Sequence, residues 1–181
     1  MKKEVNMVES CSAYEKINDF PFALLDKSNH DRESFDCGVE PLNQYIKQYA
    51  RQHMQNNISK TIVFYNPDGD KKLKSIVGFV TVKTEEVYVD LSGKGETGVL
   101  LTEAIKIGRL AVDVNYQKKG FGRDLLLTVL GWIYEEIKEK EPDKPVVIVV
   151  DAKDGAIEFY KKYGFFQLKE NDANQLYTIL K

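Results

Sequence analysis

Residues 108–126 read "GRLAVDVNYQKKGFGRDLL", and this stretch decides which fold the chain can adopt. It opens with an apolar run typical of a strand that enters a buried sheet, and after Asp124 it continues as an amphipathic helix. The turn between them, residues 117–123, contains two glycines and three cations. The start of a helix carries unpaired N–H groups at its positive end, and glycine lets a ligand approach the backbone. The stretch therefore predicts either a solvated tight turn or a site for a phosphate.

Outward from this turn, helical and strand-like segments alternate along the chain. Apolar residues at helical spacing predict a helix over residues 41–58, with Pro41 in its first turn. A short helix is predicted over residues 155–163, and Gly164 suits its C-terminal cap. Apolar runs predict strands at residues 61–65, 75–82, 85–91, 104–114, 146–152, 165–170 and 175–180. This order predicts an α/β (α+β) fold, a mixed sheet with helices on both faces, in a single domain of residues 1–181.

Composition excludes several classes of protein. Of the 181 residues, 43% are hydrophobic and 30% are charged, and the net charge of −2 gives no global signature of nucleic-acid binding, so any basic surface must be local. Cys11 and Cys37 are too few for a disulfide framework, and we expect both to be reduced. With no secretory signal and no apolar run near the ~20 residues that span a bilayer, we expect a cytoplasmic protein without a membrane partner. No His, Cys or carboxylate cluster has metal-ligand spacing, and His30 and His53 lie outside the motifs. No metal is therefore expected.

A second glycine motif, "GKGETG" at residues 93–98, matches the dinucleotide-binding fingerprint G-x-G-x-x-G. That fingerprint has physical meaning only where a helix starts at the motif, because the helix N-terminus holds the pyrophosphate. Here the third glycine leads into "VLLTEAIKIGRLAVD", which is strand-like. We therefore interpret residues 93–98 as a loop between strands.

A further unit, "VVIVVDAKDGAIEFYKKYGFFQL" at residues 146–168, combines a strand, a short helix and the start of another strand. Together with residues 108–126 it resembles the GNAT superfamily of acetyl-CoA-dependent N-acetyltransferases, and the resemblance covers roughly residues 60–170. The family's pyrophosphate motif [RQ]-x-x-G-x-[GA] is matched by Gln117, Gly120 and Gly122. Its A-x-x-F-Y-x-x-x-G-F signature is matched by Ala156, Phe159, Tyr160, Gly164 and Phe165.

The resemblance implies acetyl-CoA as co-substrate and a fold with splayed central strands. The backbone of the strand before the motif would bond the pantetheine arm, and the turn amides would hold the pyrophosphate, which favours the phosphate site over the plain turn. The side chains of that strand can still be sheet core. The cofactor-binding residues implied in this way are Leu110, Ala111, Val112, Gln117, Lys118, Lys119, Gly120, Phe121, Gly122, Arg123, Ala156 and Phe159.

Tyr160 matches the tyrosine that acts in many family members as the general acid for the leaving thiolate. A phenol with an ordinary pKa of about 10 is protonated at neutral pH and can donate to sulfur. The alternative is an aromatic packing residue, and Tyr163, further along the same helix, is a weaker substitute for the acid. A general base is not evident, and the carboxylates near the predicted sheet are Glu103, Asp113 and Asp151.

Residues 35–52, "FDCGVEPLNQYIKQYARQ", look like the start of the tRNA-acetylating toxin subgroup, which carries F-x-[SC]-G-x-x-x-L-[ND]-x-[YF] ahead of a long helix. This implies aminoacyl-tRNA as acceptor and a small DNA-binding antitoxin as partner. An α-amine, with a pKa of about 8, also suits a site without an obvious base better than lysine does. A small-molecule or protein amine, a non-catalytic module that binds coenzyme A, and a homodimer remain open alternatives. The cations expected to border the acceptor are Arg51, Lys161 and Lys162.

Overall fold

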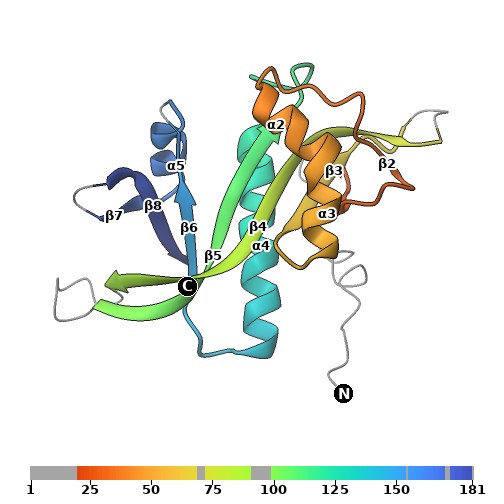
Figure 1. Cartoon of the computed structure of the whole chain (residues 1–181). Coiled ribbons are helices and arrows are strands. Elements are labelled where there is room, and N and C mark those ends of the chain that lie inside the picture. The colour runs from red at the N-terminus through yellow and green to blue at the C-terminus, as the bar shows by residue number, and fades with distance from the viewer. Residues whose placement is uncertain (1–19, 69–71, 91–98, 154, 170–171, 181) are drawn as a thin grey trace. The chain divides into compact units, whose positions relative to one another are not determined.

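The computed structural model describes residues 20–68, 72–90, 99–153, 155–169 and 172–180 (Figure 1). The chain divides into two compact units. The first unit comprises the chain up to Thr81 together with Arg109–Glu135. The second comprises Val82–Gly108 and the chain from Glu136 onward. Residues 93–98, the second glycine motif, lie outside the described residues, and a strand begins directly after them at Val99.

The strands form an eight-stranded sheet in the order β1-β3-β4-β5-β6-β8-β7, with β2 paired to β4. Parallel and antiparallel pairs both occur, which confirms the predicted mixed sheet. The strand bounds are β1 Phe22–Leu24, β2 His30–Asp31, β3 Lys60–Tyr65, β4 Lys74–Asp90, β5 Val99–Val112, β6 Val146–Asp151, β7 Phe166–Lys169 and β8 Asp172–Leu180. The helical bounds are α2 Glu40–Gln44, η3 Tyr45–Tyr49, α3 Ala50–Gln55, α4 Phe121–Lys140 and α5 Ile157–Lys162.

Three predicted segments, two strands and one helix, differ from the observed elements, and β5 begins at Val99 rather than at residue 104. The predicted strands at residues 75–82 and 85–91 are one continuous strand, β4, because the intervening residues 83 and 84 contain no turn-forming side chain. The predicted helix over residues 41–58 is interrupted by the π-helical turn η3 and ends at Gln55. Asn57 stops it by adopting the left-handed conformation (φ 55°), and the Ile58 N–H bonds back to the His53 carbonyl at 2.9 Å.

In the first unit, the helical segment α2–α3 and strands β3 and β4 enclose an apolar core. Phe35, Ile46, Val63 and Phe79 are at most 1% exposed within it. Gly78 marks the closest approach, since a Cβ there would lie 2.8 Å from the Ala111 carbonyl oxygen and 2.6 Å from a Leu125 methyl group. No larger residue fits at that position, so the first unit has β4, the end of β5 and α4 in tight contact.

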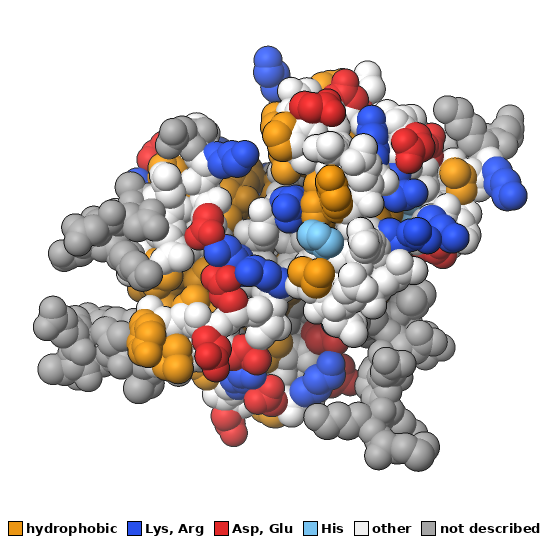
Figure 2. All heavy atoms as spheres, viewed as in Figure 1, with side chains coloured by type: hydrophobic (Ala, Val, Ile, Leu, Met, Phe, Trp, Pro, Cys, Tyr) orange, Lys and Arg blue, Asp and Glu red, His pale blue; other side chains and the backbone are white. Residues whose placement is uncertain are grey.

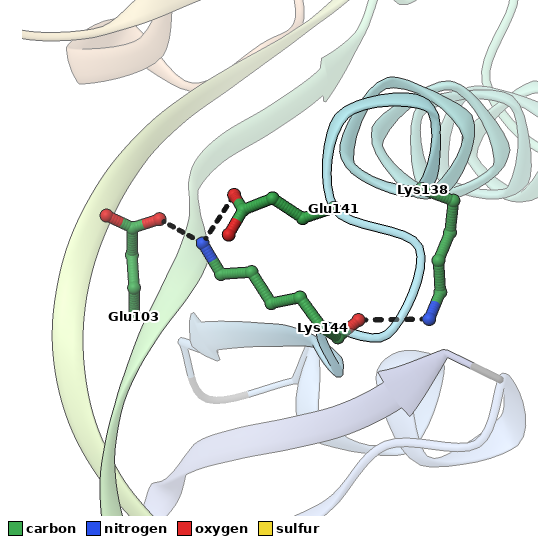
Figure 3. A network of polar contacts seen from close by, with 4 residues as sticks. All are labelled: Glu103, Lys138, Glu141 and Lys144. Carbon is green, nitrogen blue, oxygen red and sulfur yellow. Dashed lines mark hydrogen bonds and ion pairs between the residues drawn. The ribbon is translucent and has the colours of Figure 1, made fainter.

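In the second unit, β6 is the central strand and Val146–Val150 are all buried, as its continuous apolar run predicts. It pairs in parallel with β5, from Ile105 opposite Ile148 to Ile107 opposite Val150, and antiparallel with β8 along its whole length. The turn from α4 into β6 is closed by lysines (Figure 3). Lys138 donates to the Pro142 and Lys144 carbonyl oxygens, each at 2.9 Å, and Lys144 donates to Glu103 at 2.9 Å and to Glu141 at 3.0 Å.

No helix among the described residues is both long and apolar enough to cross a membrane. The described residues also contain no group of three or more His, Cys, Asp or Glu side chains placed to hold a metal ion.

Candidate functional site

The turn between β5 and α4 carries the predicted phosphate site. Lys118 (φ 59°) and Gly120 (φ 91°) both adopt the left-handed conformation. Within the described part of the chain, the amide N–H groups of residues 118–123 make no backbone hydrogen bond, and the first helical bond runs from Asp124 N to the Gly120 carbonyl. A run of unbonded N–H groups that ends at the positive pole of a 20-residue helix is suited to bind an anion. The geometry therefore fits the pyrophosphate of coenzyme A.

Three exposed cations surround these amides and are only loosely tied. Lys119 donates to the Asn115 carbonyl at 2.7 Å, and the Arg123 guanidinium lies 3.9 Å from the Asp124 carboxylate. Lys118 has no side-chain partner among the described residues. All three side chains can therefore turn toward a phosphate at little energetic cost.

The side chain of Gln117 joins the turn to two other segments of the first unit, and its contact with the cofactor remains a prediction. Its side-chain amide donates to the Cys37 carbonyl and to the Val112 carbonyl, both at 2.8 Å. It thus ties the turn to the end of β5 and to the loop ahead of α2, and its backbone N–H is also engaged, because it donates to the Asp113 carbonyl at 3.1 Å. The sequence offers no local signal for this bridge, because its partner lies 80 residues away.

Residues 110–112, the predicted pantetheine strand, form the end of β5. Ala111 and Val112 are buried and Leu110 is half-buried, so their side chains serve the core as the alternative interpretation holds. The backbone role remains a prediction, and the Val112 carbonyl is already engaged by Gln117.

None of the three carboxylates considered as a general base is free. Asp113 is buried and accepts hydrogen bonds from Asp36 N at 3.1 Å, Asn115 N at 3.0 Å and Asn115 Nδ2 at 2.8 Å. Asp151 pairs with Lys106 at 2.5 Å, and Glu103 pairs with Lys144 at 2.9 Å. These contacts give all three carboxylates structural roles, and they do not single out any one carboxylate as the proton acceptor.

In the second unit, the predicted acid Tyr160 lies on α5 with a buried ring. Its ring packs edge-on against Phe159 at 5.2 Å and Phe165 at 5.4 Å, and burial raises its pKa to about 12. The hydroxyl has no hydrogen-bond partner among the described residues, and it does not belong to the fully enclosed polar atoms. The ring therefore packs as the alternative interpretation holds, and the role of the hydroxyl as general acid remains a prediction.

The ends of α5 fix the direction of this tyrosine. Ala156 is the residue that precedes the helix, and its carbonyl accepts the Tyr160 N–H at 3.2 Å. Gly164 (φ 82°) ends the helix as predicted, and the Phe165 N–H returns to the Tyr160 carbonyl at 3.2 Å. Phe159 is half-buried between Tyr160 and Tyr163.

The cations predicted to border the acceptor fall in different units. Arg51 is exposed on α3 in the first unit, whereas Lys161 and Lys162 are exposed on α5 in the second. Lys161 pairs with Glu158 at 3.2 Å, and Lys162 lies 5.8 Å from the Tyr163 ring centroid. A shared face for all three remains a prediction.

Residues 30–176 match the model of the family described as "Acetyltransferase (GNAT) domain". A curated relative, the probable toxin TacT of Sinorhizobium fredii (strain NBRC 101917 / NGR234), is 25% identical over 150 residues, which is 78% of this chain and 81% of the relative.

Solved structures of toxins share the fold. A tyrosine-to-phenylalanine mutant of the toxin AtaT, bound to the C-terminus of the antitoxin AtaR and acetyl-CoA, aligns with a TM-score of 0.71 at 21% identity, over 90% of this chain and 94% of that one. A tyrosine-to-phenylalanine mutant of KacT aligns with a TM-score of 0.76 at 20% identity (88% and 94%). AtaT complexed with acetyl-methionyl-tRNAfMet aligns with a TM-score of 0.74 at 20% identity (89% and 95%).

Proposed function

The chain belongs to the GNAT acetyltransferase family, and on this premise we propose that it transfers the acetyl group of acetyl-CoA to the α-amine of an aminoacyl-tRNA, as the toxin of a toxin–antitoxin pair. The observation that carries the transferase activity is the set of amides at residues 118–123, which make no backbone hydrogen bond within the described part of the chain. The Tyr160 hydroxyl, which has no hydrogen-bond partner among the described residues, supports proton transfer to the leaving group. The choice of acceptor is supported by the resemblance of residues 35–52 to the toxin subgroup, by TacT and by the AtaT complex with acetyl-methionyl-tRNAfMet.

The reaction forms one bond and breaks another. The neutral amine nitrogen attacks the acetyl carbonyl carbon, the C–N bond forms, and the C–S bond breaks with its electron pair going to sulfur. Tyr160 donates its hydroxyl proton to that sulfur, and the phenol is protonated throughout the physiological range because its pKa is raised to about 12. The nitrogen loses one proton to solvent as the amide forms, and the Tyr160 phenolate regains a proton from solvent. The turn amides and the flanking cations hold the phosphates, so they position the reactants without taking part in proton transfer.

The absence of a free carboxylate among the candidate bases favours an acceptor that deprotonates easily. An α-amine with a pKa of about 8 is roughly one-tenth neutral at pH 7, whereas a lysine side chain with a pKa of about 10.4 is neutral in fewer than one molecule per thousand. The amine can therefore lose its proton to solvent before attack. This supports an α-amine over a lysine side chain as the acceptor.

A purified protein assay tests the proposal directly. The protein is incubated with acetyl-labelled acetyl-CoA and, separately, with aminoacyl-tRNA, the same tRNA without its amino acid, polyamines, and a peptide with a free N-terminus. We expect label only on aminoacyl-tRNA. Label on polyamine or peptide alone would retain the acetyltransferase and overturn the tRNA acceptor.

An antitoxin partner forms part of the same proposal. It is supported by the AtaT structures that contain AtaR, one of them bound to DNA. Co-expression with the product of the neighbouring reading frame should give a complex that co-purifies and lacks transferase activity. A partner that leaves the activity intact would contradict this part of the proposal.

A further inference from the structure

Arg109, on β5 in the first unit, has a guanidinium that is fixed in place but has unused hydrogen-bond donors. Its Cζ lies 3.7 Å from the centroid of the Tyr45 ring, a cation–π contact. Among the residues that the structure describes, it has no hydrogen-bond or ion-pair partner. A guanidinium presents five N–H donors in a planar fork that matches the oxygens of a phosphate. Arg109 is thus available to bind an anion that none of the described residues supplies.

Tyr45 is itself held rigidly beneath this guanidinium. The side chain is 3% exposed, and its hydroxyl lies 3.2 Å from the Ser59 hydroxyl. Its ring stacks on Phe79 with centroids 6.2 Å apart and meets the edge of His53 at 5.5 Å. A ring fixed by these contacts keeps Arg109 in one place, so little conformational entropy is lost when an anion binds.

Next to the buried Tyr45, the same helical segment carries an exposed aromatic ring. The ring of His53 lies 6.4 Å from that of Tyr49, which is 43% exposed. Tyr49 ends the π-helical turn η3, a distortion that is frequent at functional sites. Figure 2 shows a histidine side chain amid hydrophobic and basic side chains over α3. Exposed aromatic rings beside cations are the elements that bind unpaired nucleotides, by stacking on bases and contacting phosphates.

We infer that Tyr45, Tyr49, His53 and Arg109, here called the Arg109–Tyr49 surface, bind the unpaired 3′ end of the acceptor tRNA. Arg109 contacts a phosphate of the terminal nucleotides, and Tyr49 with His53 stacks on one of their bases. Base-paired RNA hides the faces of its bases inside the helix, so this surface selects the single-stranded end that carries the amino acid. The inference rests on the proposed function, because it supplies the site for that substrate.

The test separates stacking from phosphate contact by measuring binding of two fluorescent RNA probes. One is a hairpin with an unpaired 3′ CCA, and the other is the same hairpin with a blunt end. Tyr49→Ala should weaken binding of the CCA hairpin about 5- to 150-fold, the usual range for loss of one stacked base, and Tyr49→Phe should retain it. Arg109→Gln should weaken binding at least about tenfold and lower the slope of log affinity against log salt by about 0.7. Tyr49→Ala should leave that slope as it is.

Lys27→Gln is the matched control for Arg109→Gln. Lys27 is an exposed cation of the first unit without a side-chain partner in the described part of the chain, so its removal changes the net charge equally without touching the surface. Thermal unfolding of each variant, followed through the fluorescence of the single tryptophan, Trp132, verifies that it is folded.

The outcomes distinguish this inference from the proposed function. A wild-type protein that acetylates aminoacyl-tRNA, with Tyr49→Ala and Arg109→Gln binding the CCA hairpin as tightly as wild type, would overturn the Arg109–Tyr49 surface alone. Equal losses for CCA and blunt hairpins would also overturn it, since the surface would then recognise duplex backbone. A wild-type protein that neither acetylates aminoacyl-tRNA nor binds the CCA hairpin would overturn both.

Discussion

The side-chain amide of Gln117 donates to the Cys37 carbonyl at 2.8 Å, across 80 residues of sequence. Two further hydrogen bonds join the same two segments of the chain. Asp36 N donates to the Asp113 carboxylate at 3.1 Å, and Val114 N donates to the Asp36 carbonyl at 2.8 Å. The turn at residues 117–123 and the start of the α2–α3 segment are therefore one hydrogen-bonded assembly. A change on either side of it will be felt on the other.

Replacing Gln117 with leucine should loosen this assembly. It leaves the Cys37 and Val112 carbonyls without their donor, at about 1–3 kcal/mol in total, so the melting temperature should fall by roughly 2–12 °C. Acetyl-CoA affinity should fall with it because the turn amides lose their fixed geometry. The control is Gln48→Leu, an exposed glutamine on η3, and a Gln117→Leu protein with wild-type stability and affinity would show that the bridge contributes nothing.

Gly120→Ala tests whether the turn binds the cofactor through its backbone. A Cβ at Gly120 would meet nothing within 4 Å, so the substitution acts only through φ, which is 91° and costs about 1–2 kcal/mol for an L residue. Isothermal titration calorimetry should show acetyl-CoA binding at least about tenfold weaker. Gly164→Ala is the matched control, with φ 82° and equally open space, and should lose similar stability while keeping cofactor affinity. Equal affinities for the two variants would place the phosphates elsewhere.

Local patterns predicted the elements near the site, and long-range contacts decided what some of its residues do. The apolar run at residues 146–150, the strand–turn–helix at 108–126 and the cap at Gly164 depend on neighbouring residues, so sequence was sufficient for them. The bridge from Gln117 and the saturation of Asp113 depend on partners 80 and 77 residues away, which no periodicity reveals. Arg109 over Tyr45 is a contact of the same kind.

The helical segment α2–α3 was predicted as a helix, but its π-helical turn and its end were not. The spacing of its apolar residues predicted one helix, and a π-helical turn adds a residue to a turn without disturbing that spacing enough to be noticed. Its end could have been recognised from the Asn56–Asn57 pair, because asparagine tolerates the left-handed conformation that stops a helix.

His30 should make the stability of the protein depend on pH. The side chain is 4% exposed and its Nδ1 accepts the Asp26 N–H at 3.0 Å, so it is held neutral, and burial lowers its pKa below the ordinary value of about 6.5 even though Asp26 acts in the opposite direction. The unfolded chain then binds a proton more readily than the folded one. The free energy of unfolding should therefore be largest above pH 6.5 and fall as the pH drops below it.

Urea unfolding at pH 7.5 and pH 5.5 measures this dependence. His30→Asn is the informative variant, because the asparagine oxygen can accept the Asp26 N–H but cannot be protonated in this range. We expect the variant to lose less stability than wild type between the two pH values. An identical loss in both proteins would assign the acid sensitivity to other groups.

Tyr160→Phe should separate catalysis from folding and binding. The hydroxyl has no partner among the described residues, so removing it should leave the melting temperature and acetyl-CoA affinity near those of wild type. Turnover should fall by about 10²–10⁴-fold, the scale of a lost general acid.

Because the phenol has a pKa of about 12, the wild-type rate should rise with pH as the acceptor amine deprotonates near pH 8 and show no decline from Tyr160 below about pH 11. In bacteria, expression of the wild-type chain should arrest growth and expression of Tyr160→Phe should not. A variant that retains full turnover when the chemical step limits the rate would leave Tyr160 as a packing residue of α5, and a variant that is inactive yet still arrests growth would separate toxicity from acetyl transfer.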